Sequence, residues 1–275
     1  MIRLGTRGSA LALAQARWVA ARVGDAAELV EITTAGDLAR DIGDKSRWTG
    51  ALERALLDGE IDVAVHSAKD VPIELAAGTA VAAVPARADA RDVLVGASSL
   101  DALPAGARVG TSALRRRAQV LALRPDVEVV ELRGNVDTRL RKLAAGEVDA
   151  LVLAAAGLAR LGREDVAGAA LPFTPAPGQG CLLLQALEGA SLPSVDDASA
   201  RGALEAERAV AAALGASCHT ALGVHAADGR VQAWAGLPDG SEWLADEAGD
   251  PASLAERMLA AGAADLLARA EAMAP

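Results

Sequence analysis

The 275-residue sequence has few aromatic residues, few cysteines and no long apolar run free of charge. It contains four tryptophans, one phenylalanine and no tyrosine, which leaves little for stacking on nucleic-acid bases. The formal net charge of −10 also opposes binding to another polyanion. We therefore expect no nucleic-acid partner.

The scarce cysteines and histidines limit the covalent and metal chemistry that can be expected. Two cysteines, Cys181 and Cys218, make no disulfide framework and are typical of a reducing cytoplasm. The three histidines lack the spacing of metal ligands, so no metal is expected. Near the amino terminus Gln15, Arg17 and Arg22 interrupt the apolar stretch, which favours an amphipathic helix over a signal peptide or membrane span. We expect a cytoplasmic protein without membrane contact.

Positive charge is concentrated in one part of this acidic chain. Residues 108–142 contain nine basic and four acidic side chains, whereas the remaining residues contain 18 basic and 33 acidic ones. Only three of the 27 basic residues are lysines. Arginine binds carboxylate or phosphate as a planar fork, so the stretch predicts a site for an anionic ligand.

Strand and helix patterns alternate along the first part of the chain, which predicts an α/β fold. A strand at "IRL" and the turn "GTRGS" precede a helix over 9–23, with Ser9 as its N-cap. A second helix ends at Gly59 and leads into "EIDVAVHS", an apolar run typical of a buried parallel strand.

The same pattern returns about a hundred residues later. "RVGTSALRRRAQ" at 108–119 echoes "RLGTRGSALALAQ" at 3–15, and the sequence at 143–158 echoes that at 56–71. We expect two similar lobes that face each other across a cleft, each with a helix N-terminus directed at it. The Pro- and Gly-rich segment 173–185 is expected to be a hinge or a return to the first lobe.

The last part of the chain predicts a small α+β domain. It has a helix around 199–214, a hairpin with a turn at Asp239-Gly240, and a final helix over about 251–270. The expected domains are 1–86 with 180–195 (first lobe), 87–179 (second lobe) and 196–275 (small domain).

The arginines of residues 108–142 divide into two groups, each at an expected strand-to-helix turn. Successive helical residues diverge by about 100°, so at most two of Arg115, Arg116 and Arg117 can face the cleft, and the third is expected in solvent. Arg133 and Arg139 flank a tight loop, after which a helix should begin at Thr138. Either group alone could be a solvated face, but the two together, with Arg7 in the matching turn of the first lobe, favour a polyanion site.

Lys69 and Asp70 follow the apolar strand at the end where open α/β sheets bind ligands. They could belong to a plain polar loop closed by Pro72. Alternatively, Asp70 is a carboxylate kept ionised by nearby cations and facing a substrate that develops positive charge. His66, on the strand, is expected to be a hydrogen-bonded core residue.

The two cysteines are expected to differ in environment. Cys181 lies in an apolar strand and should pack in the core. Cys218 follows a Gly- and Ser-containing loop, where it could be a small buried hydrophobe or an exposed nucleophilic thiol.

Several sequence blocks together resemble the porphobilinogen deaminase (hydroxymethylbilane synthase) family. They run in order through nearly the whole chain: "LGTRGSALALAQA", "ALLDGEIDVAVHSAKDVP", "GTSALRRRAQ", "LRGNVDTRLRKLAAGEVDALVLAAAGLARLG", "PAPGQG" and "ERAVAAALGASC". The resemblance implies two periplasmic-binding-protein-like lobes and a small third domain that bears a cysteine, in agreement with the α/β pattern described above.

The resemblance also implies a reaction and the residues that perform it. Four porphobilinogen molecules are joined head to tail with loss of ammonia, and the product is hydrolysed to hydroxymethylbilane. The growing chain is attached to a dipyrromethane cofactor, held by a thioether to the cysteine that matches Cys218. Asp70 matches the catalytic aspartate. The matching cofactor ligands, besides Cys218, are Lys69, Thr111, Ser112, Arg115 and Arg116. The matching substrate ligands are Arg7, Ser9, Gln15, Lys45, Arg133, Asn135, Arg139, Arg160 and Gln179.

Some positions depart from the family's usual residues. Asp41 stands where a lysine is common, Trp48 where phenylalanine is usual, Ala113 where a serine is frequent and Ala221 where a proline is expected. A different class of function, a non-enzymatic anion-binding protein on the same two-lobed fold, is weakened by the presence of Cys218 and Asp70. Nothing in the sequence requires more than a monomer.

Overall fold

The computed structural model of the protein describes residues 1–24, 27–34, 46–216 and 220–273. The chain forms two compact units, which are described separately here. The first unit is Met1–Ala88 with Gly178–Leu204, and the second unit is Asp89–Pro177 with Glu205–Pro275.

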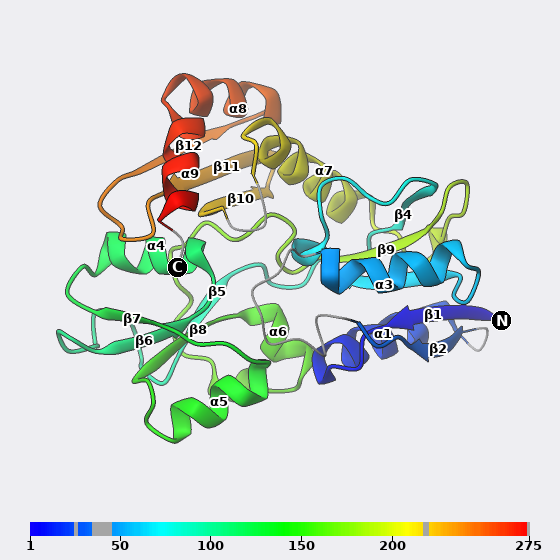
Figure 1. Cartoon of the computed structure of the whole chain (residues 1–275), viewed down its shortest axis with the longest axis horizontal. Coiled ribbons are helices and arrows are strands. Elements are labelled where there is room, and N and C mark those ends of the chain that lie inside the picture. Colours follow the sequence, from blue (N-terminus) through cyan, green and yellow to red (C-terminus); the bar gives the residue numbers. More distant parts are fainter. Residues whose placement is uncertain (25–26, 35–45, 217–219, 274–275) are drawn as a thin grey trace. The chain divides into compact units, whose positions relative to one another are not determined.

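The first unit contains a five-stranded mixed sheet with the strand order β2-β1-β3-β9-β4 (Figure 1). Strand β1 is parallel to β2 and β3, whereas β9 is antiparallel to both β3 and β4. The strands are β1 (Ile2–Thr6), β2 (Ala27–Glu31), β3 (Val63–Ser67), β4 (Thr79–Ala83) and β9 (Leu182–Leu187). Of the two alternatives for segment 173–185, a hinge or a return to the first lobe, the structure shows the return, because the segment leads into β9 of this sheet.

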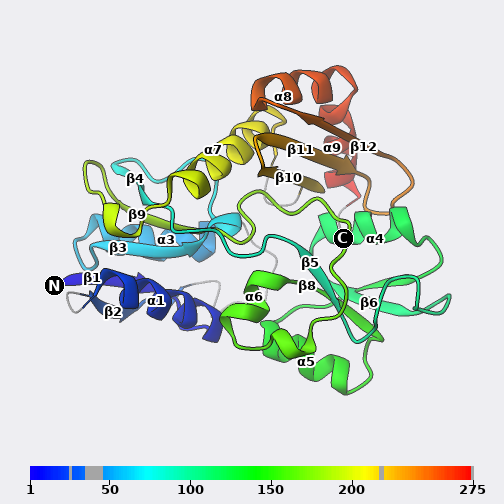
Figure 2. The same cartoon turned by 180° about the vertical axis from the view of Figure 1, so that it is seen from behind.

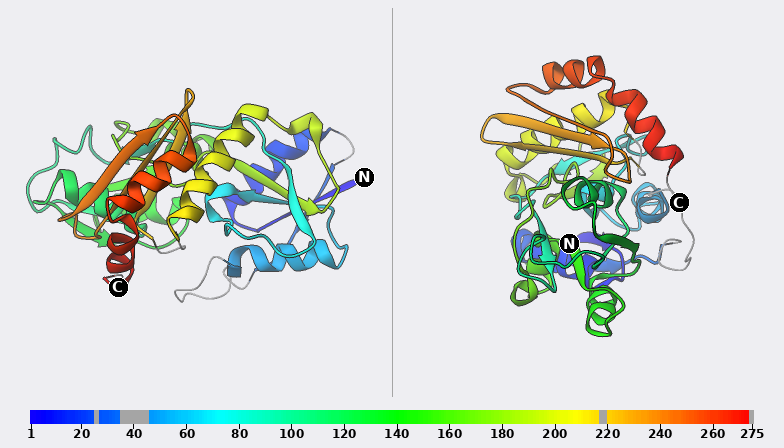
Figure 3. Two further views of the ribbon diagram at one scale, coloured as in Figure 1. Left: turned by 90° about the horizontal axis from the view of Figure 1, so that it is seen from above. Right: turned by 90° about the vertical axis from the view of Figure 1, so that its left-hand side faces the viewer.

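Helices α1 (Ala10–Val23) and α3 (Ser46–Leu57) cover opposite faces of the first sheet (Figure 3). The alternation of side chains along β3 explains this, since neighbouring residues of a strand point to opposite faces. Val63 and Val65 pack in a core with residues of α1, and Ala64 packs in a different core with residues of α3. His66 is two residues from Ala64 and so lies on the α3 face.

Ser9 begins helix α1 as the sequence predicts. It has extended backbone angles, and its hydroxyl accepts a hydrogen bond from the backbone N–H of Ala12. The bond satisfies one of the free N–H groups of the first helical turn. Gly59, expected to end the second helix, has a φ of +69°, a left-handed conformation that favours glycine. The start of α1 and the end of α3 are thus determined by local sequence.

The second unit contains a four-stranded sheet with the order β5-β8-β6-β7. Its strands and helices are β5 (Asp92–Val95), β6 (Arg108–Thr111), β7 (Glu128–Glu131), β8 (Ala150–Ala154), α4 (Leu114–Leu123), α5 (Val136–Ala144) and α6 (Ala155–Arg160). Strand β6 is parallel to β7 and β8, and β5 is antiparallel to β8. The order β7-β6-β8-β5 repeats the order β2-β1-β3-β9 of the first unit with the same strand directions, which confirms the sequence echo and the α/β fold class.

Helix α5 begins earlier than predicted. It starts at Val136, with Asn135 as its N-cap, and not at Thr138. The side-chain oxygen of Asn135 accepts a hydrogen bond from the backbone N–H of Thr138 at 2.9 Å. Thr138 is therefore the third residue of the helix, because the cap bonds a donor inside the first turn.

The carboxyl-terminal part of the second unit forms a three-stranded antiparallel sheet with helices beside it (Figure 2). Helix α7 (Ala198–Ala213) leads into this part, with its residues up to Leu204 in the first unit, and the other elements are β10 (Leu222–Ala227), β11 (Arg230–Gly236), β12 (Trp243–Ala248), α8 (Pro251–Ala260) and α9 (Ala263–Ala272). The expected turn at Asp239-Gly240 joins β11 to β12, and Gly240 has a φ of +73°. Whether residues 196–275 form a domain of their own stays a prediction.

The prediction of a single helix over 251–270 is wrong. The segment forms two helices, separated at Gly262, whose φ of +94° is left-handed. Apolar residues on both sides of the break, among them Leu254, Met258 and Leu266, pack in one core with the sheet. The apolar pattern therefore continues through a break that only the glycine marks. Among the described residues, no helix combines the length and the apolar character needed to cross a membrane.

Candidate functional site

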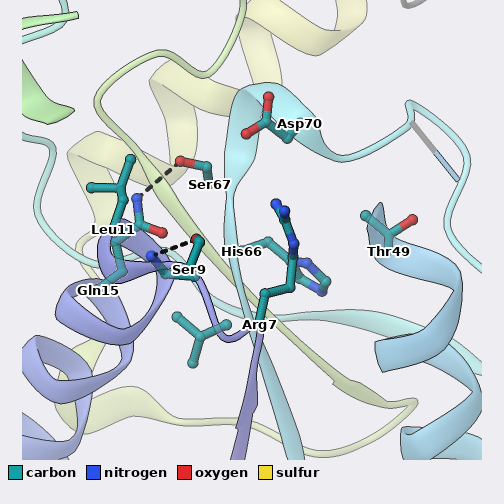
Figure 4. Close-up of a pocket in the computed structure, with 10 residues that line it drawn as sticks. Arg7, Ser9, Leu11, Gln15, Thr49, His66, Ser67 and Asp70 are labelled. Carbon is teal, nitrogen blue, oxygen red and sulfur yellow. Dashed lines mark hydrogen bonds between the residues drawn. The ribbon is translucent and has the colours of Figure 1, made fainter. Parts of the chain in front are cut away.

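A pocket lies in the first unit where β1 and β3 end, which is the edge at which open α/β sheets bind ligands (Figure 4). Its volume of about 60 Å³ is several times what one water needs. The lining residues are Arg7, Ser9, Leu11, Ala12, Gln15, Thr49, Val65, His66, Ser67 and Asp70. Four of the predicted site residues are therefore brought together by the fold: Arg7, Ser9, Gln15 and Asp70.

The polar side chains of this pocket come from several elements of the first unit. Arg7 follows β1, and its side chain extends toward Asp70 in Figure 4. From helix α1, the Nε2 of Gln15 donates to the hydroxyl of Ser67 at 3.0 Å. Thr49, on α3, is buried, and its hydroxyl has no hydrogen-bond partner within the described residues. A buried polar group of this kind indicates a site with unused capacity to bind a polar ligand.

Lys69 and Asp70 form a single 3₁₀ turn, η1 (Ala68–Asp70), directly after β3. The Nζ of Lys69 donates to the side-chain oxygen of Gln179 at 3.3 Å, so two more predicted ligands lie together. Gln179 is fully buried, and its backbone oxygen accepts a hydrogen bond from Arg87 at 3.0 Å. This arrangement holds the turn that carries Lys69 against the segment that contains Gln179 and leads into β9.

A second charged cluster lies in the second unit around Asp92, the first residue of β5. The fully buried carboxylate accepts hydrogen bonds from Arg115 at 2.7 Å and from Arg116 at 3.0 Å. Both guanidinium groups also donate to backbone oxygens, Arg115 to Thr174 and Arg116 to Val152. Burial lowers the pKa of Arg115 below its usual range, and the charge of Asp92 opposes that shift.

Arg139 adds another positive charge to this cluster. Its guanidinium donates to the hydroxyl of Ser112 at 2.9 Å and to the backbone oxygen of Gly134 at 2.9 Å. Burial and the nearby charge of Arg116 lower the pKa of Arg139 to about 10. Arg115 and Arg116 are both bonded to the carboxylate of Asp92, whereas Arg139 is not. A bound anion would therefore be stabilised beside Arg139.

The other predicted residues of the second unit have local partners. Arg133 forms an ion pair with Glu131 at 2.7 Å on the surface, with 46% of its side chain exposed. Asn135 caps α5, Thr111 accepts a hydrogen bond from the N–H of Ala113 at 3.2 Å, and Arg160 lies in the last turn of α6. The contacts of Arg133 and Asn135 serve the local structure, and their roles as ligands stay predictions.

Arg117, the third arginine of the triplet, was expected in solvent, and that expectation is wrong. It is partly buried, and its Nη1 donates to the backbone oxygen of Val129 at 3.0 Å. Helical divergence directs it away from Arg115 and Arg116, as predicted, and toward the neighbouring strand β7.

Of the two cysteines, Cys181 belongs to the described part of the chain. Cys181 is 1% exposed and packs in a core with residues that include Leu183 and Leu204, which confirms the prediction for it. Cys218, Lys45 and Asp41 lie outside the described residues. In the part of the chain that the structure describes, no group of histidine, cysteine, aspartate and glutamate side chains could hold a metal ion.

Sequence reasoning did not single out Asp92, although it is central to the second cluster. Two adjacent buried arginines require a nearby carboxylate, because an uncompensated buried charge is costly. The signal that could have found it is an acidic residue at the start of an apolar strand, "RDVLV" at 91–95. Gln185, which is hydrogen-bonded to His66, and its partner Glu53 had no comparable signal.

An α/β protein with arginine-rich sites beside the ends of parallel strands belongs to the class of anion-binding proteins. The comparison with known families is more specific. Residues 2–192 match the family described as "Porphobilinogen deaminase, dipyromethane cofactor binding domain". The chain belongs to the porphobilinogen deaminase family.

Curated relatives match almost the whole chain. A porphobilinogen deaminase of Rubrobacter xylanophilus is 46% identical over 96% of this chain and 95% of its own length. Those of Deinococcus deserti and Brevibacillus brevis are 43% and 42% identical, over 93% and 97% of this chain and 92% and 96% of their own lengths. Among solved structures, a periplasmic substrate-binding protein of an ABC transporter from Coxiella burnetii is similar, with a TM-score of 0.43, 15% identity, and coverage of 76% of this chain and 92% of that one.

Proposed function

We propose that this protein joins four porphobilinogen molecules head to tail, with loss of ammonia at each step, and hydrolyses the product to hydroxymethylbilane. The observation that carries this proposal is the pocket of the first unit, which places the carboxylate of Asp70 beside Arg7 at the end of the central strands. Membership of the porphobilinogen deaminase family supports the substrate and the reaction class.

The charges of the pocket match the chemistry of the substrate. Porphobilinogen is a pyrrole with an acetate, a propionate and an aminomethyl group, so it offers carboxylates to cations and N–H groups to acceptors. Arg7 lines the pocket, and Lys69 is the neighbour of Asp70 in η1. A charge-assisted hydrogen bond from each to a substrate carboxylate is worth about 1.5–3 kcal/mol. These contacts would orient the pyrrole so that its N–H faces Asp70.

Asp70 is proposed as the catalytic residue. When the protonated amino group leaves as ammonia, the methylene carbon that it leaves behind and the ring nitrogen share a positive charge. A carboxylate held near the pyrrole nitrogen stabilises this charge most strongly in the transition state, when the C–N bond is breaking. The carbon that bonds to this methylene loses one proton as the new C–C bond forms, and Asp70 is the acidic residue of the pocket that can accept or pass on a proton.

The residues of the second unit fit a cofactor that carries several carboxylates. Arg115, Arg116 and Arg139 provide three buried or partly buried guanidinium groups, and Asp92 is bonded to two of them. The lowered pKa of Arg139 indicates that this charge lacks full compensation, and a carboxylate would provide it. Ser112, hydrogen-bonded to Arg139, offers a further donor. Dipyrromethane, when bound through a thioether to Cys218, supplies the free pyrrole carbon from which the chain grows.

The proposal is tested by incubating the purified protein with porphobilinogen and measuring ammonia release and product formation. The matched pair of variants is Asp70→Asn and Asp62→Asn, since Asp62 is a surface carboxylate of the same unit, paired with Arg3. We expect Asp70→Asn to fold and to lose activity about a hundredfold or more, because one carboxylate aimed at a developing cation is worth a few kcal/mol. Asp62→Asn should keep its activity. A wild-type protein that binds porphobilinogen without releasing ammonia would instead indicate an anion-binding protein.

A further inference from the structure

A buried amide, Gln185 on β9, lies on the α3 face of the first sheet and has a fixed orientation. Its Nε2 donates to the hydroxyl oxygen of Thr79 at 2.7 Å and to a carboxylate oxygen of Glu53 at 3.1 Å. The hydroxyl hydrogen of Thr79 is already donated to the backbone oxygen of Ala76 at 2.6 Å, so Thr79 can only accept from Gln185. Both partners of the amide nitrogen are acceptors, and the amide oxygen must therefore point the other way.

The amide oxygen of Gln185 lies 3.1 Å from the Nε2 of His66. Because that oxygen can only accept, the ring hydrogen of a neutral His66 must be on Nε2. Burial lowers the pKa of His66 to about 4, so the ring is neutral at neutral pH. The chain Glu53–Gln185–His66 thus determines which ring nitrogen carries the hydrogen and leaves a lone pair on Nδ1.

His66 also lines the pocket that contains Arg7 and Asp70 (Figure 4). It is 6% exposed, and its Nδ1 makes no hydrogen bond to any residue that the structure describes. A neutral ring nitrogen with a lone pair accepts N–H or O–H donors and offers nothing to a carboxylate oxygen. The pocket therefore offers both a cation for carboxylates and acceptors for N–H groups.

We propose that His66 is a substrate-binding residue, which accepts an N–H of the pyrrole substrate through Nδ1 and is held in the required tautomer by Gln185. The proposal rests on the proposed function, because porphobilinogen supplies the N–H donor. Two groups of the substrate have this chemistry, the pyrrole nitrogen and the protonated aminomethyl group. Asp70 and His66 then accept hydrogen bonds from different N–H groups of the substrate or from the same one. One acceptor is a carboxylate and the other is a neutral ring nitrogen.

Two isosteric substitutions separate this role from a purely structural one. In His66→Asn the amide can place its oxygen where Nδ1 lies, so an acceptor is kept and the contact with Gln185 is lost. In His66→Gln the amide reaches the position of Nε2, so the contact with Gln185 is kept and the pocket acceptor is lost. We expect His66→Gln to bind porphobilinogen about 2- to 10-fold more weakly than wild type, the value of one net hydrogen bond, and His66→Asn to bind more tightly than His66→Gln. The opposite order, or wild-type affinity in both, would overturn the proposal.

The tautomer and the contact are measured directly on the holoenzyme labelled with ¹⁵N-histidine. The signal of His66 is assigned by its absence from the spectrum of His66→Gln. We expect hydrogen on Nε2 and none on Nδ1 at pH 7, and a shift of the Nδ1 resonance when ligand is added. The two ligands are porphobilinogen and the same pyrrole diacid with a methyl group in place of the aminomethyl group. A shift with both ligands assigns the pyrrole N–H, and a shift with porphobilinogen alone assigns the aminomethyl group.

The outcomes distinguish this proposal from the proposed function. A wild-type protein that releases ammonia from porphobilinogen, but whose Nδ1 resonance is unchanged at saturating ligand or carries hydrogen, would overturn the role of His66 alone. A wild-type protein that neither binds nor consumes porphobilinogen would overturn both.

Discussion

Replacing Asp92 by asparagine tests whether one buried carboxylate holds the arginine cluster of the second unit together. The wild-type carboxylate is fully buried and accepts charge-assisted hydrogen bonds from two guanidinium groups, at 2.7 Å from Arg115 and 3.0 Å from Arg116. Asparagine has nearly the same shape but no charge. One of its two polar atoms is an NH₂ group, which would face a guanidinium donor and can accept nothing from it.

The expected loss of stability is large. Removing one partner of a buried ion pair costs about 3–5 kcal/mol, because the remaining charge stays buried without compensation. In Asp92→Asn two such charges remain, and burial already lowers the pKa of Arg115. We therefore expect Asp92→Asn to lose at least about 3 kcal/mol of unfolding free energy. The measurement is urea unfolding followed by the fluorescence of Trp234 and Trp243, which lie stacked in the same unit with ring centroids 6.4 Å apart.

The control is Asp246→Asn, which also removes a carboxylate bonded by an arginine in the second unit. Asp246 accepts two hydrogen bonds from Arg257, at 2.8 and 2.9 Å, but both side chains are well exposed. An exposed pair of this kind contributes about 1 kcal/mol or less. If Asp92→Asn and Asp246→Asn cost the same small amount, the second unit does not depend on the buried carboxylate and the reasoning about the cluster is refuted.

Three further predictions concern a ligand, a titration and a turn. Arg139→Leu should fold with wild-type stability but be purified without the covalent pyrroles, which intact mass would show; loss of the fold with normal loading per folded molecule would contradict the assignment. The folded-state pKa of His66 is lowered from 6.5 to about 4, so wild type should lose stability relative to His66→Gln as the pH falls through this window, by at most about 1.4 kcal/mol per pH unit. Parallel urea titrations check this, and a pH-independent difference would contradict it. Gly240→Ala should destabilise more than Gly229→Ala, since both glycines have a φ of +73° but an added Cβ at Gly240 would meet the backbone N of Ala122, whereas at Gly229 it would meet nothing within 4 Å; equal melting temperatures would show that the contact is relieved without cost.

Local signals made much of the fold predictable from the sequence. Ser9 begins α1 and Gly59 follows α3 because a hydroxyl cap and a left-handed glycine act within a few residues. The echo of Gly-Thr turns predicted two similar α/β lobes, and the structure shows two sheets that share a strand order. The break at Gly262 was missed, since the apolar residues on both sides of it face the same core and the pattern gives no sign of an interruption.

The candidate site was predictable where residues act near their own strand end. Arg7 and Asp70 follow β1 and β3, and the parallel pairing of these strands brings their ends together. Asp92 and Gln185 were not predictable in this way, because they meet Arg116 and His66 only after strands distant in sequence have paired. The cap formed by Asn135 shows the converse: this polar residue was expected as a ligand, and its side chain accepts a hydrogen bond from the backbone of its own helix.

The mass of the intact purified protein tests the central claim most directly. Protein made in a cell that produces porphobilinogen should be heavier than its sequence by two linked pyrrole units, and an aldehyde reagent for pyrroles should colour it. Cys218→Ser should remove the added mass, the colour and the activity together, since a hydroxyl is far less nucleophilic than a thiol at neutral pH. Cys181→Ala, which changes a cysteine that is 1% exposed, should keep all three. A wild-type protein with the bare mass of its sequence, or an added mass that depends on Cys181, would contradict the assignment of a covalent dipyrromethane to Cys218.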